Sequence, residues 1–187
     1  QKHFVDSLAL CKALDVNKIS SLIDIGTGAG FPGIPLKIAY PHLKVTLLDS
    51  LQKRIKFLDE VVMQLGLTDV ETIHGRAEDY AKPSMKRESY DMCVSRAVAN
   101  LASLSEYCLP YVKVGGYFVP YKSGKVDDEL EESKKAVFLL GGKIEEEVKF
   151  NLPDSDISRS LIKIRKSSST PKKYPRKSGL ATKEPIK

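Results

Sequence analysis

The chain has little of what marks membrane-embedded, disulfide-bonded or metal-bound proteins. Its apolar runs fall well short of the ~18 residues that a membrane span needs, and no signal-peptide pattern opens it. Its three cysteines, Cys11, Cys93 and Cys108, are widely spaced and never arranged as Cys-x-x-Cys, and its three histidines have no metal-ligand spacing. We therefore expect no disulfide framework, no metal site and no membrane partner, and a reducing cytoplasm as the compartment.

What is present is the composition of one globular domain. The 187 residues are 42% hydrophobic and 29% charged, and one domain usually takes ~100–200 residues. The net charge of +6 is uneven, because residues 163–187 contain nine basic side chains and one acidic, whereas residues 1–162 contain 21 basic and 23 acidic. This asymmetry predicts a polyanionic partner. We assign residues 1–166 to the folded domain and residues 167–187 to a basic, flexible tail.

The hydrophobic pattern alternates strands with helices. Apolar runs predict strands over residues 22–25, 45–48, 70–74, 90–94 and 117–121. Helical stripes predict helices over residues 2–14, 51–65, 100–109 and 127–140. Two more strands, 143–152 and 159–165, follow each other with no helix between them and must pair antiparallel. This order predicts an α/β fold of the Rossmann-like class I methyltransferase type, with a seven-stranded, mostly parallel sheet and a C-terminal antiparallel hairpin.

A glycine-rich stretch, Asp24-Ile25-Gly26-Thr27-Gly28-Ala29-Gly30-Phe31-Pro32-Gly33, follows the first strand. Glycine suits a tight turn whose backbone approaches a ligand. Such a loop binds dinucleotides or S-adenosylmethionine. The dinucleotide pattern G-x-G-x-x-G requires glycine where Phe31 stands, and Pro32 and Pro35 remove two amides that a pyrophosphate would use. The loop therefore favours S-adenosylmethionine over the cofactor of an NAD-type oxidoreductase.

Asp49 follows the second strand, 23 residues beyond Gly26. A carboxylate at this place can accept hydrogen bonds from both ribose hydroxyls of an adenosine. An acid also stabilises the start of a helix, so Asp49 alone does not separate the two classes of ligand.

The end of the fourth strand, Val94-Ser95-Arg96-Ala97-Val98, limits the chemistry. It lacks the Asn/Asp-Pro-Pro-aromatic clamp used to methylate exocyclic amino groups, and Cys93 and Cys108 lie in apolar elements where core packing explains them. What remains is transfer to an atom that already carries a lone pair, such as a guanine ring nitrogen, which needs positioning rather than a general base. Arg96 is the candidate positioning residue, because open α/β sheets bind ligands at the carboxyl ends of their strands.

Several motifs together resemble one family. They are Lys2-His3-Phe4-x-Asp6-Ser7-Leu8, the glycine-rich stretch with Ile34-Pro35, Leu48-Asp49-Ser50, Gly75-Arg76-Ala77-Glu78 and Ser95-Arg96-Ala97. Over essentially the whole chain they are similar to the ribosomal RNA small subunit methyltransferase G family, also called glucose-inhibited division protein B. The resemblance implies transfer of a methyl group from S-adenosylmethionine to N7 of one guanine in bacterial 16S ribosomal RNA. Members usually carry further helices ahead of Lys2, and the chain starts at Gln1, so we expect the natural start to be missing.

The resemblance also implies cofactor contacts at Gly26, Phe31, Ala77 and Glu78, and places Arg96 at the mouth of the active site. Glu78 could equally begin a short helix. The full predicted cofactor site is Gly26, Gly28, Gly30, Phe31, Asp49, Ala77, Glu78 and Arg96. Arg96 is the only predicted catalytic residue, and it acts by positioning.

The tail predicts RNA contact through Lys172, Lys173, Tyr174, Arg176 and Lys177. Phosphates attract the charges, and the Tyr174 ring can stack on a base; a solubilising disordered end is the other interpretation. Removing residues 167–187 should then weaken RNA binding and leave cofactor affinity unchanged. We expect a monomer that acts on 16S ribosomal RNA or on the small ribosomal subunit. The alternative function is a non-catalytic assembly factor of the small subunit that retains the fold.

Overall fold

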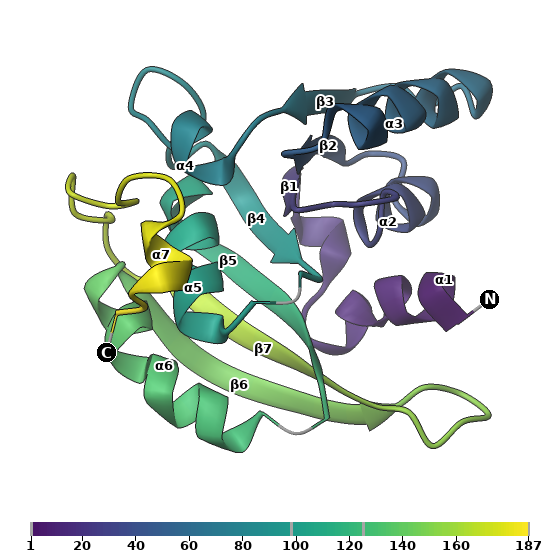
Figure 1. Cartoon of the computed structure of the whole chain (residues 1–187). Helices are drawn as coiled ribbons and strands as arrows, with labels where there is room; N and C mark the ends of the chain where they lie inside the picture. Colours follow the sequence, from purple (N-terminus) through teal and green to yellow (C-terminus); the bar gives the residue numbers. More distant parts are fainter. Residues whose placement is uncertain (1, 98, 125, 187) are drawn as a thin grey trace.

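The computed structural model describes residues 2–97, 99–124 and 126–186 (Figure 1). Its strands are β1 (Ser21–Ile25), β2 (Lys44–Asp49), β3 (Val70–His74), β4 (Tyr90–Ser95), β5 (Val112–Ser123), β6 (Gly142–Asn151) and β7 (Ser158–Lys166). Its α-helices are α1 (Lys2–Leu8), α2 (Gly33–Ala39), α3 (Gln52–Gln64), α4 (Ala77–Tyr80), α5 (Leu101–Cys108), α6 (Asp127–Leu139) and α7 (Leu180–Lys183). Three short 3-10 helices, η1 (Ala9–Lys12), η2 (Val16–Lys18) and η3 (Leu109–Tyr111), complete the list.

The seven strands form one sheet in the order β3-β2-β1-β4-β5-β7-β6. The strands β1 to β5 pair in parallel, while β7 lies between β5 and β6 and is antiparallel to both. The predicted Rossmann-like sheet with its C-terminal hairpin is therefore confirmed. The strand order reverses between β1 and β4, and open α/β sheets bind ligands at such a reversal.

The strands alternate their side chains between two hydrophobic cores, one on each face of the sheet. Ile23 and Leu48 face the core formed with α4, α5 and α6, which also contains Tyr174. Leu22 and Leu47, their neighbours in the chain, face the core formed with η1, α2 and α3. Because both faces are covered, the central strands consist almost entirely of apolar residues, which is why the sequence pattern located them.

Two local predictions differ from the structure. The fifth strand begins at Val112 rather than at 117, because Gly115 and Gly116 lie within it; a Cβ on Gly116 would stand 2.4 Å from the carbonyl oxygen of Asp91 on β4. The helix expected over 2–14 consists of α1 followed by the 3-10 helix η1. At the start of α3, the Asp49 carboxylate accepts the Leu51 amide at 2.9 Å.

Residues 167–186 follow β7 back across the face of the sheet that α5 covers, and α7 packs against α5 (Figure 1). The side chains of Thr170, Tyr174 and Ala181 are buried there. The expected free tail therefore differs from the structure, in which apolar side chains anchor it to the domain. No helix within the described residues is long and apolar enough to cross a membrane.

Candidate functional site

A cavity of about 830 Å³ lies at the carboxyl ends of β1, β2 and β4. This volume falls within the ~300–1,000 Å³ of small-molecule sites. Of the eight residues predicted to bind the cofactor, seven line the cavity: Gly26, Gly28, Phe31, Asp49, Ala77, Glu78 and Arg96. The structure thus brings together side chains that are separated by up to 70 residues in the chain.

The glycine loop exposes its backbone to this cavity. Gly26 and Gly28 have φ angles of +70° and +62°, which favour glycine. A Cβ atom on Gly28 would meet nothing within 4 Å, so the backbone there is open to a ligand. Gly30 differs from its prediction, since it does not line the cavity and a Cβ atom on it would stand 2.6 Å from Ile34 and 2.9 Å from Leu58. Gly30 serves the packing of the loop against α2 and α3.

The first amides of α2 have internal partners. The Gly33 amide donates to the Asp24 carboxylate at 2.9 Å, and the Ile34 amide donates to the Gly30 carbonyl at 2.7 Å. Pro35 has no amide hydrogen to offer. This helix start therefore has few donors for a phosphate group, as the sequence predicted.

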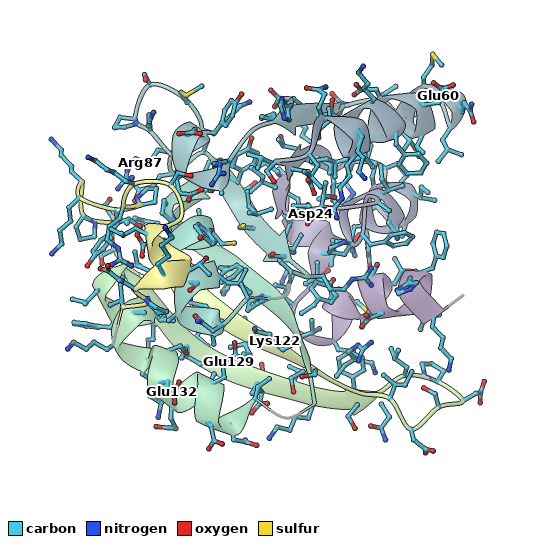
Figure 2. The ribbon with its side chains drawn as sticks, viewed as in Figure 1. Asp24, Glu60, Arg87, Lys122, Glu129 and Glu132 are labelled. Atoms are coloured by element: carbon cyan, nitrogen blue, oxygen red, sulfur yellow. The ribbon has the colours of Figure 1, made fainter. Side chains whose placement is uncertain are left out.

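Asp24 is fully buried beneath the loop (Figure 2). One of its oxygens accepts from the Thr27 hydroxyl at 2.7 Å and from the Gly33 amide, while Oδ1 has no partner within the described residues. Burial raises the pKa of Asp24 to about 6, against the lowering effect of the Thr27 and Gly33 hydrogen bonds. Asp24 ties the two ends of the loop together at an electrostatic cost.

Asp49 ends β2 with both carboxylate oxygens engaged. The amides of Gly28 and Leu51 donate to it, each at 2.9 Å, and so does the Arg54 guanidinium at 3.1 Å. The Asp49 side chain is 2% exposed and that of Arg54 is 48% exposed. The two amides hold the carboxylate in place, and Arg54 is the partner that can turn out to solvent when a ligand arrives.

Ala77 and Glu78 begin α4 at the far side of the cavity. The Glu78 carboxylate accepts a hydrogen bond from the amide of Gly179, 101 residues later in the chain, at 2.9 Å. Gly179 and Thr182 also line the cavity. Glu78 thus lies in the first turn of a short helix and also lines the cavity.

Arg96 lies where β4 ends, and Asp6 and Phe31 orient it. Its guanidinium donates to the Asp6 carboxylate at 3.2 Å and lies over the ring of Phe31, 5.3 Å from its centroid. Asp6, with a side chain 3% exposed, also accepts from Arg159 at 3.3 Å. The His3 ring lies tilted beside that of Phe31, with 5.8 Å between the centroids. Arg96 is thus held by an ion pair and an aromatic platform.

A second cavity, of about 520 Å³, adjoins the first. The two share His3, Arg96, Ala97 and Ala99 as lining residues. At the other side of the second cavity, Lys122 of β5 donates to Glu129 of α6 at 2.6 Å, and the two side chains lie together in Figure 2. Arg96 therefore stands at a junction between two cavities.

The cysteines behave as the sequence indicates for core residues. Cys93 and Cys108 are fully buried, and burial raises the pKa of the Cys93 thiol, which disfavours the thiolate that a nucleophile needs. Among the residues that the structure describes, no group of three or more His, Cys, Asp or Glu is placed to hold a metal ion.

The predicted RNA-binding residues divide into two groups. Lys172, Lys173 and Lys177 are exposed. Tyr174 is 8% exposed and packs in the core, and Arg176 forms an ion pair with the buried Glu106 at 2.6 Å. In this structure the Tyr174 ring has no free face for a base, so its expected stacking role is not supported.

Sequence reasoning missed several residues that surround the site. Arg54 donates to Asp49, and its place in the first helical turn after that acid was a usable signal. Asp6 and Arg159, which hold and extend the Arg96 network, come from opposite ends of the chain. No local pattern links Gly179 or Thr182 to the cavity. These residues become functional candidates only through tertiary contacts.

Comparison with known proteins decides the family. The family model described as rRNA small subunit methyltransferase G (GidB) matches residues 1–161. The chain belongs to this family. It is 59% identical over 186 residues to the ribosomal RNA small subunit methyltransferase G of Lachnoclostridium phytofermentans. The aligned part is 100% of this chain and 77% of that protein. The corresponding protein of Acetivibrio thermocellus is 56% identical over 185 residues, or 99% of this chain and 76% of that protein.

Membership in the rRNA small subunit methyltransferase G family confirms the predicted resemblance and the predicted methyltransferase class, and the oxidoreductase alternative is wrong. Solved structures agree in fold at low identity. The StiE O-methyltransferase segment has a TM-score of 0.69 at 17% identity, covering 88% of this chain and 74% of that one. TYW2 of M. jannaschii in complex with AdoMet has a TM-score of 0.67 at 15% identity, covering 89% and 78%.

Proposed function

We propose that this protein transfers a methyl group from S-adenosylmethionine to N7 of a guanine in bacterial 16S ribosomal RNA. The observation that carries the proposal is the pair of cavities that meet at Arg96. Group transfer between two bound molecules needs two sites with a common boundary, so that the reacting atoms can approach each other. The family description names the small-subunit ribosomal RNA.

The first cavity fits S-adenosylmethionine. Gly28 leaves open space beside the backbone, where a side chain would otherwise stand. Asp49 can accept ribose hydroxyls in place of the exposed Arg54, because two backbone amides keep its carboxylate in position. The internally bonded amides at the start of α2 suit a cofactor without a phosphate group. Ala77 and Glu78 complete the cavity on the opposite side.

When bound, S-adenosylmethionine supplies a methyl group made electrophilic by its positively charged sulfur. The lone pair of guanine N7 takes this methyl group in one displacement, in which the N–C bond forms as the C–S bond breaks and its electron pair remains on sulfur. No proton leaves N7, so the protein needs no general base. Its contribution is to align the two reactants, and good alignment alone can lower a barrier by ~7–11 kcal/mol.

The second cavity is the proposed site of the guanine. The base must leave its stack or lie in a loop to enter such a site. Arg96 can donate to the O6 oxygen of guanine, a common arginine contact, and leave N7 free toward the first cavity. Asp6 and Phe31 hold the guanidinium in place for this contact. Arg96 is therefore the proposed positioning residue of the transfer.

The exposed Lys172, Lys173 and Lys177 supply the proposed phosphate contacts. Arg176 and Tyr174, which serve packing, are excluded from this set. The protein acts as a monomer on the RNA or on the assembling small subunit, in the cytoplasm where that substrate is located.

The test is methylation of a substrate that lacks the modification. The protein is incubated with S-adenosylmethionine labelled in its methyl group and with small subunits from cells without the enzyme, and the RNA is digested to nucleosides. We expect the label in N7-methylguanosine. Cofactor binding without any labelled nucleoside would instead favour the non-catalytic assembly factor. Arg96→Lys and Arg96→Ala serve as matched variants, and both should bind cofactor and transfer methyl groups more slowly.

A further inference from the structure

The C-terminal segment, defined as residues 170–184, lies across α5 beside the mouth of the first cavity. Figure 1 shows α7 in front of α5 and below α4. The Ser103 hydroxyl of α5 donates to the Ala181 carbonyl at 2.6 Å, and Ala181 is 1% exposed. The segment is therefore fitted to the domain, although its sequence has the composition of a free tail.

This segment supplies part of the wall of the first cavity. Gly179 and Thr182 line the same cavity as Gly28 and Asp49. The Gly179 amide donates to Glu78, and the Thr182 hydroxyl lies 2.7 Å from that of Tyr107, another lining residue. A hydrogen bond from Arg76 to Ser178, at 2.8 Å, joins the segment to the residue that precedes α4.

A buried ion pair holds the segment in place. Arg176 donates to both oxygens of Glu106, from Nε at 2.9 Å and from Nη2 at 2.6 Å, and its backbone amide donates to the same carboxylate at 2.8 Å. Glu106 is 1% exposed. Because a buried carboxylate without a partner is strongly unfavourable, Glu106 favours the conformation in which Arg176 covers it.

A second anchor lies at the start of the segment. Arg87 donates to the carbonyl oxygens of Thr170 at 2.6 Å and Tyr174 at 2.8 Å, and it is labelled in Figure 2 beside the C-terminal segment. The Tyr174 side chain fills space in the core. Because residues 170–176 are anchored to the domain, the residues that follow, 177 to 183, lie beside the cavity.

We propose that the C-terminal segment is a structural part of the cofactor site and that affinity for S-adenosylmethionine depends on it. Gly179 positions the Glu78 carboxylate, and Thr182 with Tyr107 forms part of the wall of the cavity. Enclosure removes water and strengthens each polar contact inside the cavity. The segment thus contributes to cofactor binding, contrary to the expectation from its composition.

Tryptophan fluorescence tests the placement directly, because the chain has no tryptophan of its own. Thr182→Trp puts a single fluorophore at the cavity, and Lys183→Trp puts one on the next residue, which does not line it. We expect S-adenosylmethionine to change the emission of Thr182→Trp in a saturable way, or to bind that variant more weakly by calorimetry, and to do neither with Lys183→Trp. Wild-type affinity with unchanged emission in Thr182→Trp would overturn the proposal.

The anchor is tested by exchanging the ion pair for a neutral pair. Glu106→Gln with Arg176→Gln leaves no buried charge without a partner, and a thermal melt reports whether the domain stays folded. We expect the Kd for S-adenosylmethionine to rise about 10-fold, as the loss of one charge-assisted contact does, with KM for the cofactor rising and kcat little changed. Lys183→Gln is the control. An unchanged Kd in a folded double variant would contradict the proposal, whereas failure of the wild type to bind S-adenosylmethionine would contradict the cofactor assignment itself.

Discussion

Two stretches of the chain line the same cavity and are held there in opposite ways. The glycine loop is fixed mainly by partners close to it in the chain: Thr27 and Gly33 donate to Asp24, three and nine residues away, and Gly28 donates to Asp49, 21 residues away. The C-terminal segment is fixed by distant partners, with Arg176 and Glu106 70 residues apart and Gly179 and Glu78 101 residues apart. One wall of a ligand site can therefore be formed by residues of a single sequence motif, while another wall is formed by residues that only tertiary contacts bring to the site.

The largest effect is expected where the loop meets its acid. Asp49→Ala removes the carboxylate that holds Gly28 and Leu51 and that would accept the ribose hydroxyls. Each hydrogen bond to a charged group contributes ~1.5–3 kcal/mol, so we expect cofactor affinity to fall about 100-fold or more. Isothermal titration calorimetry measures the change, and Arg54→Ala is the matched control, which should bind the cofactor at least as well as the wild type. Equal losses in both variants would contradict the proposed replacement of Arg54 by the ribose hydroxyls, because Arg54 would then be needed for binding as well.

How much the sequence could predict follows the same division. The strands are predicted within one or two residues of their observed ends, except β5. For the central strands β1, β2 and β4 the reason is that buried parallel strands are nearly continuous apolar runs. The glycine loop and Asp49 could be recognised because the glycines after the first strand and the acid after the second strand have a characteristic spacing. The packing of Tyr174 and Arg176 could not be predicted, because a basic, proline-containing stretch has the composition of a disordered tail. Only the structure shows that Arg176 pairs with the buried Glu106 and that Tyr174 packs in the hydrophobic core.

The two regions also differ in the partners of their buried carboxylates. Glu106 is paired with Arg176, whereas Asp24 accepts hydrogen bonds from neutral donors only, and burial raises its pKa from 3.8 to about 6. Between these values the folded protein binds more protons at this group than the unfolded chain does, so the contribution of Asp24 to stability falls as pH rises. At 1.36 kcal/mol per pKa unit, we expect the wild type to lose about 2 kcal/mol relative to Asp24→Asn between pH 4.5 and pH 7.

Urea unfolding of both proteins at several pH values measures this difference. Comparing the two chains cancels the effects of the other carboxyl groups, such as Glu88 and Asp91, whose pKa values are lowered and act in the opposite direction. A difference in stability that does not vary with pH would mean that Asp24 has an ordinary pKa, and the loop would then store no electrostatic cost.

A smaller effect on RNA binding is expected from the exposed lysines of the C-terminal segment, as opposed to the side chains that anchor the segment to the domain. Lys172→Gln, Lys173→Gln and Lys177→Gln together remove exposed charge and keep the anchoring side chains of Arg87, Tyr174 and Arg176, although Lys173 Nζ also lies 5.2 Å from the centroid of the Tyr174 ring. We expect RNA affinity to fall about 10-fold at low salt and the slope of log K against log salt to decrease by about 2, because each phosphate contact contributes ~0.7–0.9. Cofactor affinity should not change. A fall in cofactor affinity would mean that the outer lysines also hold the wall of the cavity.

The smallest effect on RNA is expected from Tyr174, which distinguishes packing from stacking. Tyr174→Leu keeps an apolar side chain in the core and removes the aromatic ring. If the ring stacked on a base, its loss would cost ~1–3 kcal/mol of RNA binding. Since the ring is 8% exposed, we expect RNA affinity to change less than about 2-fold, while the free energy of unfolding falls by ~1–3 kcal/mol from imperfect repacking. RNA binding measured well below the melting temperature reports the first quantity and urea unfolding reports the second. A large loss of RNA affinity without loss of stability would show that Tyr174 leaves the core when RNA binds, and the C-terminal segment would then be a mobile arm rather than a wall.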